Sequence, residues 1–343
     1  MTSTTIRLGL VAAISSGAKA AYAAPALAHD ALLPGGIQAG KILQLLHFTL
    51  GLCAAVFVAI LITIVIALLR MRRHDEIRLA DLSSLDSQEK GASRGVVFAT
   101  CISFTLLVGL VLADVMTDRA LSELPIDNAV QIEMTGHQWW WEARYTMPNG
   151  STFTVANELH VPSGEPVVIS LKTADVIHSF WVPALHGKQD MLPGLISTIK
   201  FRADHSGVYR GQCAEFCGAE HALMAFAIVA QPRTQYDAWA ASQAADAPPA
   251  AEADERRGEA VFLAHCASCH TVRGTSANGE IGPDLTHLMS RGSLAAETLT
   301  NVRGNLAGWI VNPQNLKPGT TMPPNPLAAA DLQLLLTWLG TLK

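Results

Sequence analysis

The run from Cys213 to Met224 carries side chains that bind metal ions, in the spacing Cys-x3-Cys-x3-His-x2-Met. Thiolate and thioether ligands are soft and select copper, whereas imidazole suits copper, iron or zinc. Because a thiolate can bridge two metal ions, two cysteines in one short loop could hold a pair of coppers. A further histidine is then needed, and His178, in a strand-like apolar run, is the natural candidate. A structural zinc site of two cysteines and two histidines is the alternative, which the methionine and the long separation of His178 from the loop disfavour.

A second metal-binding pattern lies near the C-terminus. Cys266 and Cys269 are followed directly by His270, the Cys-x2-Cys-His spacing that attaches haem c through two thioether bonds and one iron ligand. Met322, in Gly-Thr-Thr-Met-Pro-Pro, is the expected sixth ligand of the iron. A haem with both axial positions filled suits electron transfer and leaves no position for oxygen. A redox-active dithiol is the alternative, and the adjacent histidine disfavours it.

Composition predicts a membrane protein with more than one domain. The chain has 343 residues, of which 50% are hydrophobic and 15% charged. This length exceeds what one core usually supports, so two or three domains are expected. The net charge of −5 gives no sign of nucleic-acid binding. Four of the six cysteines belong to the metal motifs, and Cys53 and Cys101 lie in apolar segments, which leaves none for a structural disulfide.

The N-terminal segment predicts export. Residues 1–28 have a basic residue, an apolar stretch and an Ala-rich end, as signal peptides do. Cleavage is expected before His29, and Ala21-Tyr22-Ala23 offers an earlier site. Haem attachment through thioethers is also expected of an extracytoplasmic domain.

Two apolar runs, 42–69 and 96–113, are long enough to cross a bilayer, so residues 29–118 are expected to form a transmembrane hairpin. The connecting loop is rich in positive charge, which predicts that it is cytoplasmic and that the metal-binding regions lie outside. These charges are Arg70, Arg72, Arg73, Arg78, Lys90 and Arg94. The expected location is the inner membrane of a bacterium, with the copper and haem domains on the periplasmic side.

The remaining chain divides into two further domains. Within 119–233, short apolar runs alternate with Pro- and Gly-containing turns, the pattern of an all-β sandwich or barrel. The runs are 130–134, 151–155, 167–171, 196–201 and 225–229. Residues 234–252 are assigned to a flexible linker because their composition is rich in Ala, Pro, Gln and Asp. Helical patterns at 254–265 and 329–342 predict a small all-α domain over 253–343.

The copper motif, His178 and the run Gly-His-Gln-Trp-Trp-Trp-Glu at 136–142 resemble subunit 2 of cytochrome c oxidase, whose dinuclear copper centre is called CuA. The resemblance implies a cupredoxin-like barrel. It also implies these ligands: the side chains of His178, Cys213, Cys217, His221 and Met224 and the backbone carbonyl of Glu215. By the same resemblance, the Glu215 carboxylate is a possible ligand of a magnesium ion shared with the catalytic subunit. Glu89 resembles the family's proton-channel glutamate, although the loop lengths differ.

The last domain resembles a class I cytochrome c. The runs 282–285 and 309–313 match that family's segments around the haem, beside the Cys266–His270 motif and Met322. This second resemblance covers the whole of the expected all-α domain.

The resemblance assigns Trp139 as the residue through which electrons reach the copper centre. Packing at the membrane interface is the simpler alternative for its neighbours Trp140 and Trp141. Between Arg119 and Arg233 there are 11 acidic and 8 basic residues, which suits a basic cytochrome partner only weakly. Glu158, Asp175 and Asp190 are candidates for a partner face, and a solvated surface is the alternative for each.

The expected function is electron delivery within a haem-copper terminal oxidase. Electrons from cytochrome c or a membrane cytochrome complex would reach the copper centre through haem c and pass to subunit 1, where dioxygen is reduced to water and protons are moved. Other oxidase subunits are expected partners. A quinol oxidase subunit 2 is one alternative, and the complete ligand set argues against it. A membrane-anchored electron carrier or a nitrogen-oxide reductase subunit is the other, and the sequence leaves it open.

Overall fold

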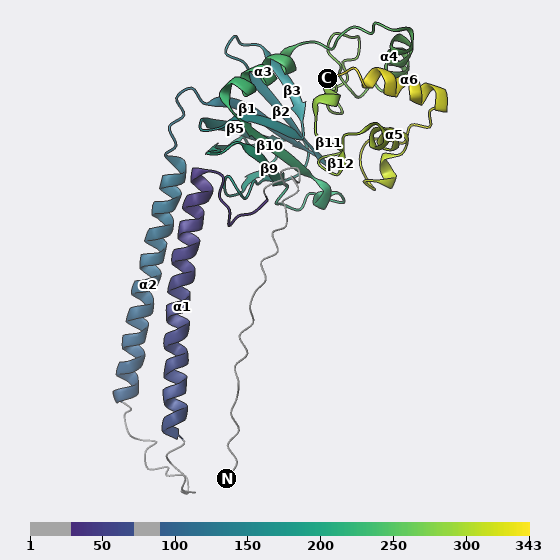
Figure 1. Cartoon of the computed structure of the whole chain (residues 1–343). Helices are drawn as coiled ribbons and strands as arrows, with labels where there is room; N and C mark the ends of the chain where they lie inside the picture. The colour runs from purple at the N-terminus through teal and green to yellow at the C-terminus, as the bar shows by residue number, and fades with distance from the viewer. Residues whose placement is uncertain (1–28, 72–89) are drawn as a thin grey trace, which may run out of the picture.

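The structure is a computed structural model that describes residues 29–71 and 90–343 (Figure 1). It consists of a helical hairpin, a β domain above one end of the hairpin, and a helical domain beside the β domain. The three predicted folds are therefore confirmed. The expected signal peptide, Glu89 and most of the basic loop lie outside the described residues.

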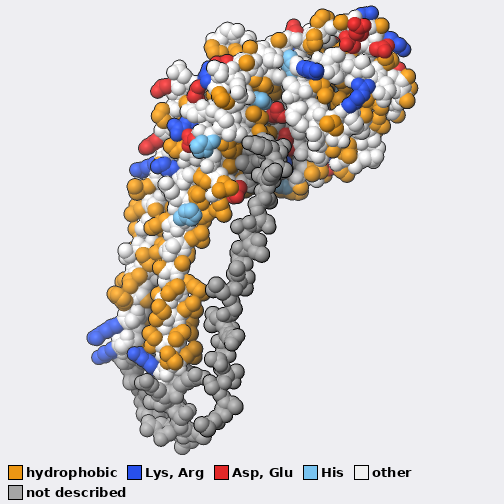
Figure 2. Space-filling model, viewed as in Figure 1, with side chains coloured by type: hydrophobic (Ala, Val, Ile, Leu, Met, Phe, Trp, Pro, Cys, Tyr) orange, Lys and Arg blue, Asp and Glu red, His pale blue; other side chains and the backbone are white. Residues whose placement is uncertain are grey.

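The hairpin consists of α1 (Ile37–Met71) and α2 (Lys90–Ser122), which lie side by side. Both helices extend beyond the predicted apolar runs. At a rise of about 1.5 Å per residue, each is roughly 50 Å long, more than the ~30 Å hydrocarbon core of a bilayer. Their apolar side chains are exposed along the whole hairpin (Figure 2). Lipid is the environment that such a surface fits, because water disfavours so large an apolar face.

The β domain has two sheets. The larger has the strand order β3-β2-β1-β5-β8, in which β1 and β5 are parallel and the other pairs antiparallel. The smaller has the order β4-β10-β9. Their bounds are β1 (Val130–His137), β2 (Trp140–Thr146), β3 (Thr152–Ala156), β4 (Glu158–Pro162), β5 (Pro166–Thr173), β8 (Ser197–Arg202), β9 (Gly207–Gln212) and β10 (Ala225–Gln231). The short strands β6 (His178–Phe180) and β7 (Gln189–Met191) form a separate pair.

Alternating side chains of the two sheets form one core between them. Met134, Trp141, Ile169 and Phe226 are among its fully buried members. Trp141 packs edge-on against Phe226, with 5.1 Å between the ring centroids. This contact joins the larger sheet to β10, the strand that follows the loop of residues 213–224. We call this loop the copper loop, and the core holds the strand at its end in place.

The helical domain packs α4 (Ala253–His265) against α6 (Ala329–Leu339). Phe262 and Trp338 are buried at this contact, with 4.9 Å between their ring centroids. The helix α5 (Arg303–Val311), the strands β11 (Ser293–Leu294) and β12 (Leu299–Thr300), and the 3-10 turns η3 (Leu288–Ser290) and η4 (Pro313–Asn315) complete the domain. The long loops between these elements carry the residues that surround the haem cavity.

The expected flexible linker is not a free tether in the structure. Its first half is part of α3 (Arg233–Ala244), which buries Tyr236 and Ala240. Its second half is bound to the helical domain by two hydrogen bonds. The His287 ring donates to the Ala245 carbonyl at 3.0 Å, and the Ala247 amide donates to the Arg273 carbonyl at 3.0 Å. Composition could not predict this order, because the Ala-rich segment is held by contacts with residues that are distant in the sequence.

Candidate metal centres

The predicted copper ligands come together where two neighbouring strands end. Cys213 directly follows β9, and Met224 directly precedes β10. The Cys213 amide donates to the Met224 carbonyl at 3.0 Å, which closes the loop between them at its base. His178 opens β6 and reaches the loop from the other side. The loop therefore starts and ends on a rigid antiparallel pair, and only its tip is free to adopt a shape dictated by ligands.

The side chains converge on two sulfur atoms. The Sγ atoms of Cys213 and Cys217 are 3.8 Å apart. The Nδ1 atom of His178 lies 3.8 Å from the first sulfur, and that of His221 lies 3.6 Å from the second. The thioether sulfur of Met224 is 3.7 Å from Cys217 Sγ. The arrangement has one imidazole on each side of a central pair of thiols.

This donor set fits copper. Among the described residues, His178, Cys213 and Cys217 are a group whose ligand atoms all lie within 4.8 Å of one another. The Glu215 carbonyl lies 3.3 Å from Cys213 Sγ, while the Glu215 residue is exposed. Two thiols, two imidazoles, a thioether and a carbonyl are softer than a zinc site requires. The geometry brings together all six residues that the sequence motif singled out.

The two thiols are strongly coupled. A hydrogen bond from Cys217 lowers the pKa of Cys213 to about 3, in spite of burial. The same contact, together with burial, raises the pKa of Cys217 above its usual range. The pair therefore holds one negative charge readily, and a second thiolate requires a nearby cation. Metal ions would supply that positive charge.

Asp175 orients His178. One of its carboxylate oxygens lies 2.8 Å from His178 Nε2, which directs Nδ1 towards Cys213. The other accepts the Gln138 backbone amide at 2.7 Å. A carboxylate that binds the other ring nitrogen fixes the tautomer and the orientation of a metal-binding histidine. The sequence made Asp175 a candidate for a partner-binding surface. Its position three residues before His178 was the only sign that it could orient this histidine.

Gln138 and Trp139, in the turn between β1 and β2, support the loop. The indole N–H of Trp139 and the side-chain amide of Gln138 both donate to the Cys217 carbonyl, at 3.0 and 2.8 Å. Trp139 is half-buried. Trp141 is fully buried and is a core residue, which excludes the membrane-interface alternative for its side chain.

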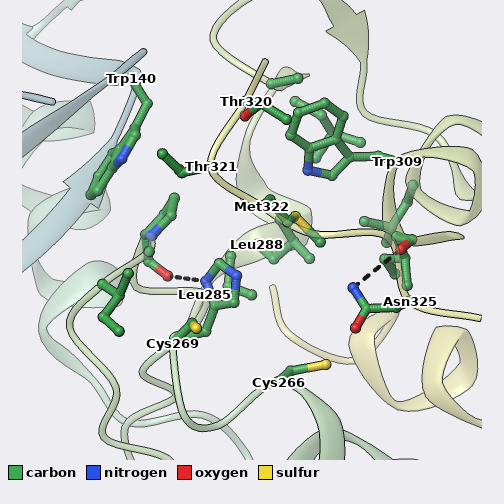
Figure 3. A pocket seen from close by; sticks show the side chains of 18 of the residues that line it. Trp140, Cys266, Cys269, Leu285, Leu288, Trp309, Thr320, Thr321, Met322 and Asn325 are labelled. Atoms are coloured by element: carbon green, nitrogen blue, oxygen red, sulfur yellow. Dashed lines mark hydrogen bonds between the residues drawn. The ribbon is translucent and has the colours of Figure 1, made fainter. Parts of the chain in front are cut away.

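A cavity in the helical domain is surrounded by the predicted haem-binding residues. Figure 3 shows Cys266 and Cys269 on one side of it and Met322 with Trp309 on the other. The wall between them is apolar and includes Leu285 and Leu288. A flat apolar macrocycle with covalent attachment at two thiols fits such a cavity.

The imidazole of His270 has a fixed orientation that suits the predicted iron ligand. Its Nδ1 atom lies 2.8 Å from the Pro283 carbonyl and donates to it, which leaves Nε2 as the free ligand atom. Gly282 makes this possible, because a Cβ atom there would lie 2.6 Å from the imidazole ring. Burial lowers the pKa of His270, which favours the neutral imidazole that binds metal.

The helical and β domains share one wall of the haem cavity. Trp139, Trp140 and Asn157 of the β domain line it beside Met322, and Figure 3 shows Trp140 entering from the β domain. At another point of the interface, the Gly292 amide donates to the Glu158 carboxylate at 2.8 Å. Glu158 therefore binds the chain's own helical domain, whereas the sequence made it a candidate for an external partner.

Two family models match the chain. The model described as cytochrome c oxidase subunit II, periplasmic domain, matches residues 146–231, and the model described as cytochrome c matches residues 255–343. The first match covers the β domain from the end of β2 onwards, including the copper loop, and the second covers the helical domain with the haem cavity.

Individual proteins are also similar to parts of this chain. A solved periplasmic domain of subunit II of cytochrome oxidase from Bradyrhizobium japonicum is 31% identical, over 33% of this chain and 92% of that one, with a TM-score of 0.32. Cytochrome c oxidase subunit 2 of Alkalihalophilus pseudofirmus is 41% identical over 63% of this chain and 62% of its own length. The subunit 2 of Bacillus sp. PS3 is 32% identical over 71% of this chain and 72% of its own length. Similarity of this extent indicates common descent, and the chain belongs to the cytochrome c oxidase subunit 2 family.

Proposed function

We propose that the chain carries electrons within a haem-copper terminal oxidase. Cytochrome c would be the donor, haem c and the dinuclear copper centre would be the one-electron carriers, and subunit 1 would reduce dioxygen to water and translocate protons. Cys266, Cys269, His270 and Met322 would hold the haem. Copper would be held by the convergent set His178, Cys213, Glu215, Cys217, His221 and Met224.

The observation that carries the proposal is the contact of Trp139 with both centres. Its indole nitrogen donates to the carbonyl of Cys217, and Trp139 is also among the residues that line the haem cavity. A single residue therefore contacts the copper loop and borders the haem cavity. This supports Trp139 as the point at which electrons pass into the copper domain.

Both ligand sets support a carrier, with the oxygen chemistry proposed for another subunit. Cys213, Cys217 and Met224 are buried, and His270 and Met322, which would bind the iron, both line the haem cavity. Residues that fill the coordination positions of a metal leave no site for a substrate. The chain's own residues hold and orient the carriers and exclude water from them.

We place the hairpin in the inner membrane of a bacterium, with the β and helical domains on the periplasmic side. Support comes from Arg70, Lys90 and Arg94, which lie at the end of the hairpin far from the β domain (Figure 2). Positive charge marks the cytoplasmic end of such helices. The exposed carboxylate of Glu215, on the copper loop, is available for a magnesium ion shared with a neighbouring subunit.

The test is the Cys217→Ser variant in the assembled oxidase. It removes one of the two thiols that would hold copper, so the haem should still be reduced by an added donor while oxygen consumption falls about ten-fold or more. Cys53→Ser, on the exposed surface of α1, is the matched control and should leave oxygen consumption unchanged. Normal oxygen consumption by Cys217→Ser would contradict the proposal.

A further inference from the structure

One loop of the helical domain reaches across to the copper loop. It precedes Met322 and contains Lys317, whose side chain is only 2% exposed. The Lys317 Nζ atom donates to the Trp139 carbonyl at 3.0 Å and to the Leu223 carbonyl at 3.0 Å, both in the β domain. It also lies 3.4 Å from the Ala295 carbonyl of its own domain. The ammonium thus joins three backbone segments from two domains.

Every N–H donor of the Lys317 ammonium group has a hydrogen-bond acceptor in this contact. An ammonium group has three N–H donors, and each has a carbonyl acceptor here. Burial lowers the pKa of Lys317 to about 8, while the negative charge of Glu220 opposes that effect. Glu220 is itself buried, at 4% exposure, and stands on the copper loop. A buried charge is costly unless it is satisfied, so a lysine at this position indicates a specific role in holding the two domains together.

The two backbone acceptors in the β domain both belong to the copper site. Leu223 directly precedes Met224, and Trp139 holds the Cys217 carbonyl through its indole. The same loop also touches the copper loop two residues after Lys317. Gly319 has a φ of +96°, and a Cβ atom there would lie 3.4 Å from the Cβ of Ala219. The chain segment that would supply the sulfur ligand of the haem therefore rests directly on the segment that would bind copper.

We propose that Lys317 is a positioning residue that fastens the Met322 loop to the copper loop, so that electrons cross a fixed interface and not a contact made anew by a moving domain. This inference rests on the proposed function and deepens it, since it names the residue that sets the geometry of the internal electron transfer. Because Lys317 binds backbone carbonyls, it would act on the relative placement of the two loops and leave the ligands of each metal unchanged.

The experiment uses the full oxidase and the variant Lys317→Met, which keeps the length and apolar stem of the side chain and removes its donors and charge. The rate of internal electron transfer is measured after flash reduction of the haem, together with the spectra and midpoint potentials of both centres. We expect the rate to fall roughly ten-fold, as the loss of charged hydrogen bonds predicts, with both spectra and potentials unchanged. The variant rate should also slow as solvent viscosity increases, because the domain must then move into place, whereas the wild-type rate should not.

Controls separate this inference from simpler explanations. Lys343→Met makes the same chemical change at an exposed lysine of the same domain and should transfer electrons at the wild-type rate. Lys317→Arg restores the charge and the donors and should recover most of the lost rate. If Lys317→Met loses either cofactor, Lys317→Gln is measured in its place with the same expectations.

The outcomes are distinguishable. If the variant measured, Lys317→Met or its replacement Lys317→Gln, transfers electrons at the wild-type rate without viscosity dependence, the role of Lys317 is overturned. The proposed function stays intact in that case. A slower rate with shifted potentials would also overturn it, since the residue would then tune the centres and not their placement. Absence of internal transfer in the wild-type oxidase would overturn the proposed function itself.

Discussion

His178 and Asp175 form a pair in which the carboxylate holds one nitrogen of the imidazole at 2.8 Å and the other nitrogen faces Cys213 Sγ at 3.8 Å. The ring is completely buried, so it has no solvent to turn towards. The direction of this ligand is therefore set by a residue that does not touch the metal.

Asp175→Asn should weaken copper binding without abolishing it. The amide keeps the shape of the carboxylate but not its charge, and outer partners of metal ligands typically contribute about 10–100-fold to affinity. Copper affinity is measured by competition with a chelator. Asp190→Asn, an exposed change on β7, is the control and should bind copper normally. Equal affinity of both variants would show that Asp175 does not orient His178.

Met224→Leu should retain copper and change its properties. The thioether is a weak ligand that tunes the potential of a copper site, and leucine preserves the buried apolar volume. We expect the full copper content together with altered optical and paramagnetic spectra and a shifted midpoint potential. Unchanged spectra would exclude Met224 as a ligand.

The contact between Glu158 and Gly292 should depend on pH. Burial raises the pKa of Glu158, but hydrogen bonds from His160 and the Gly292 amide outweigh burial and leave the pKa below its usual range. A lowered pKa stabilises the docked form above the ordinary glutamate value of about 4.3, and that stability is lost as the pH falls through the lower, folded value. The protection of the Gly292 amide against hydrogen exchange, relative to its intrinsic rate at each pH, should therefore fall in acid.

The matched variant for this pH effect is Glu158→Gln, which cannot ionise. Its hydrogen exchange at Gly292 should be faster than in the wild type at neutral pH, with a smaller acid-dependent change in protection. Identical pH profiles in the two proteins would assign the effect to another group.

Cutting the chain near Pro248 should leave copper bound and make electron transfer concentration-dependent. The intact connection keeps the haem domain beside the β domain, and the interface contacts alone must hold it after the cut. We would introduce a protease site there and follow copper reduction before and after cleavage, at several dilutions. A rate unaffected by cleavage and dilution would mean that the haem domain is not on the electron path or that it never dissociates; gel filtration of the cleaved protein separates the two.

The metal motifs were predictable because their residues lie close together in the sequence. Cys213 to Met224 span one loop, and Cys266 to His270 span one turn, so spacing alone specifies the ligand types. His178 and Met322 had to be found at a distance. The roles of Asp175 and Lys317 could not be predicted in this way, because each depends on a contact between segments that only the folded chain brings together.

The secondary structure was predictable where apolar residues alternate in short runs, as in β1 and β10. The expectation missed β4 and β9, whose runs are interrupted by His160 and Arg210, and both strands are held by pairing with β10. It also missed α3, where the buried face consists of Tyr236, Ala240 and Gln243 and gives little hydrophobic contrast. Tertiary packing decides the structure of such segments.

The shared wall of tryptophans has a consequence for the outside donor. Because Trp139 and Trp140 line the haem cavity, a soluble donor of the proposed oxidase would meet the helical domain before it could reach these tryptophans. Residues 253–343 contain seven acidic and seven basic side chains, so that domain has no net charge. The excess of acidic residues on the β domain is then irrelevant to the encounter. Capture of a donor would rest on local apolar contact, and added salt would change its rate far less than in an electrostatically steered pair.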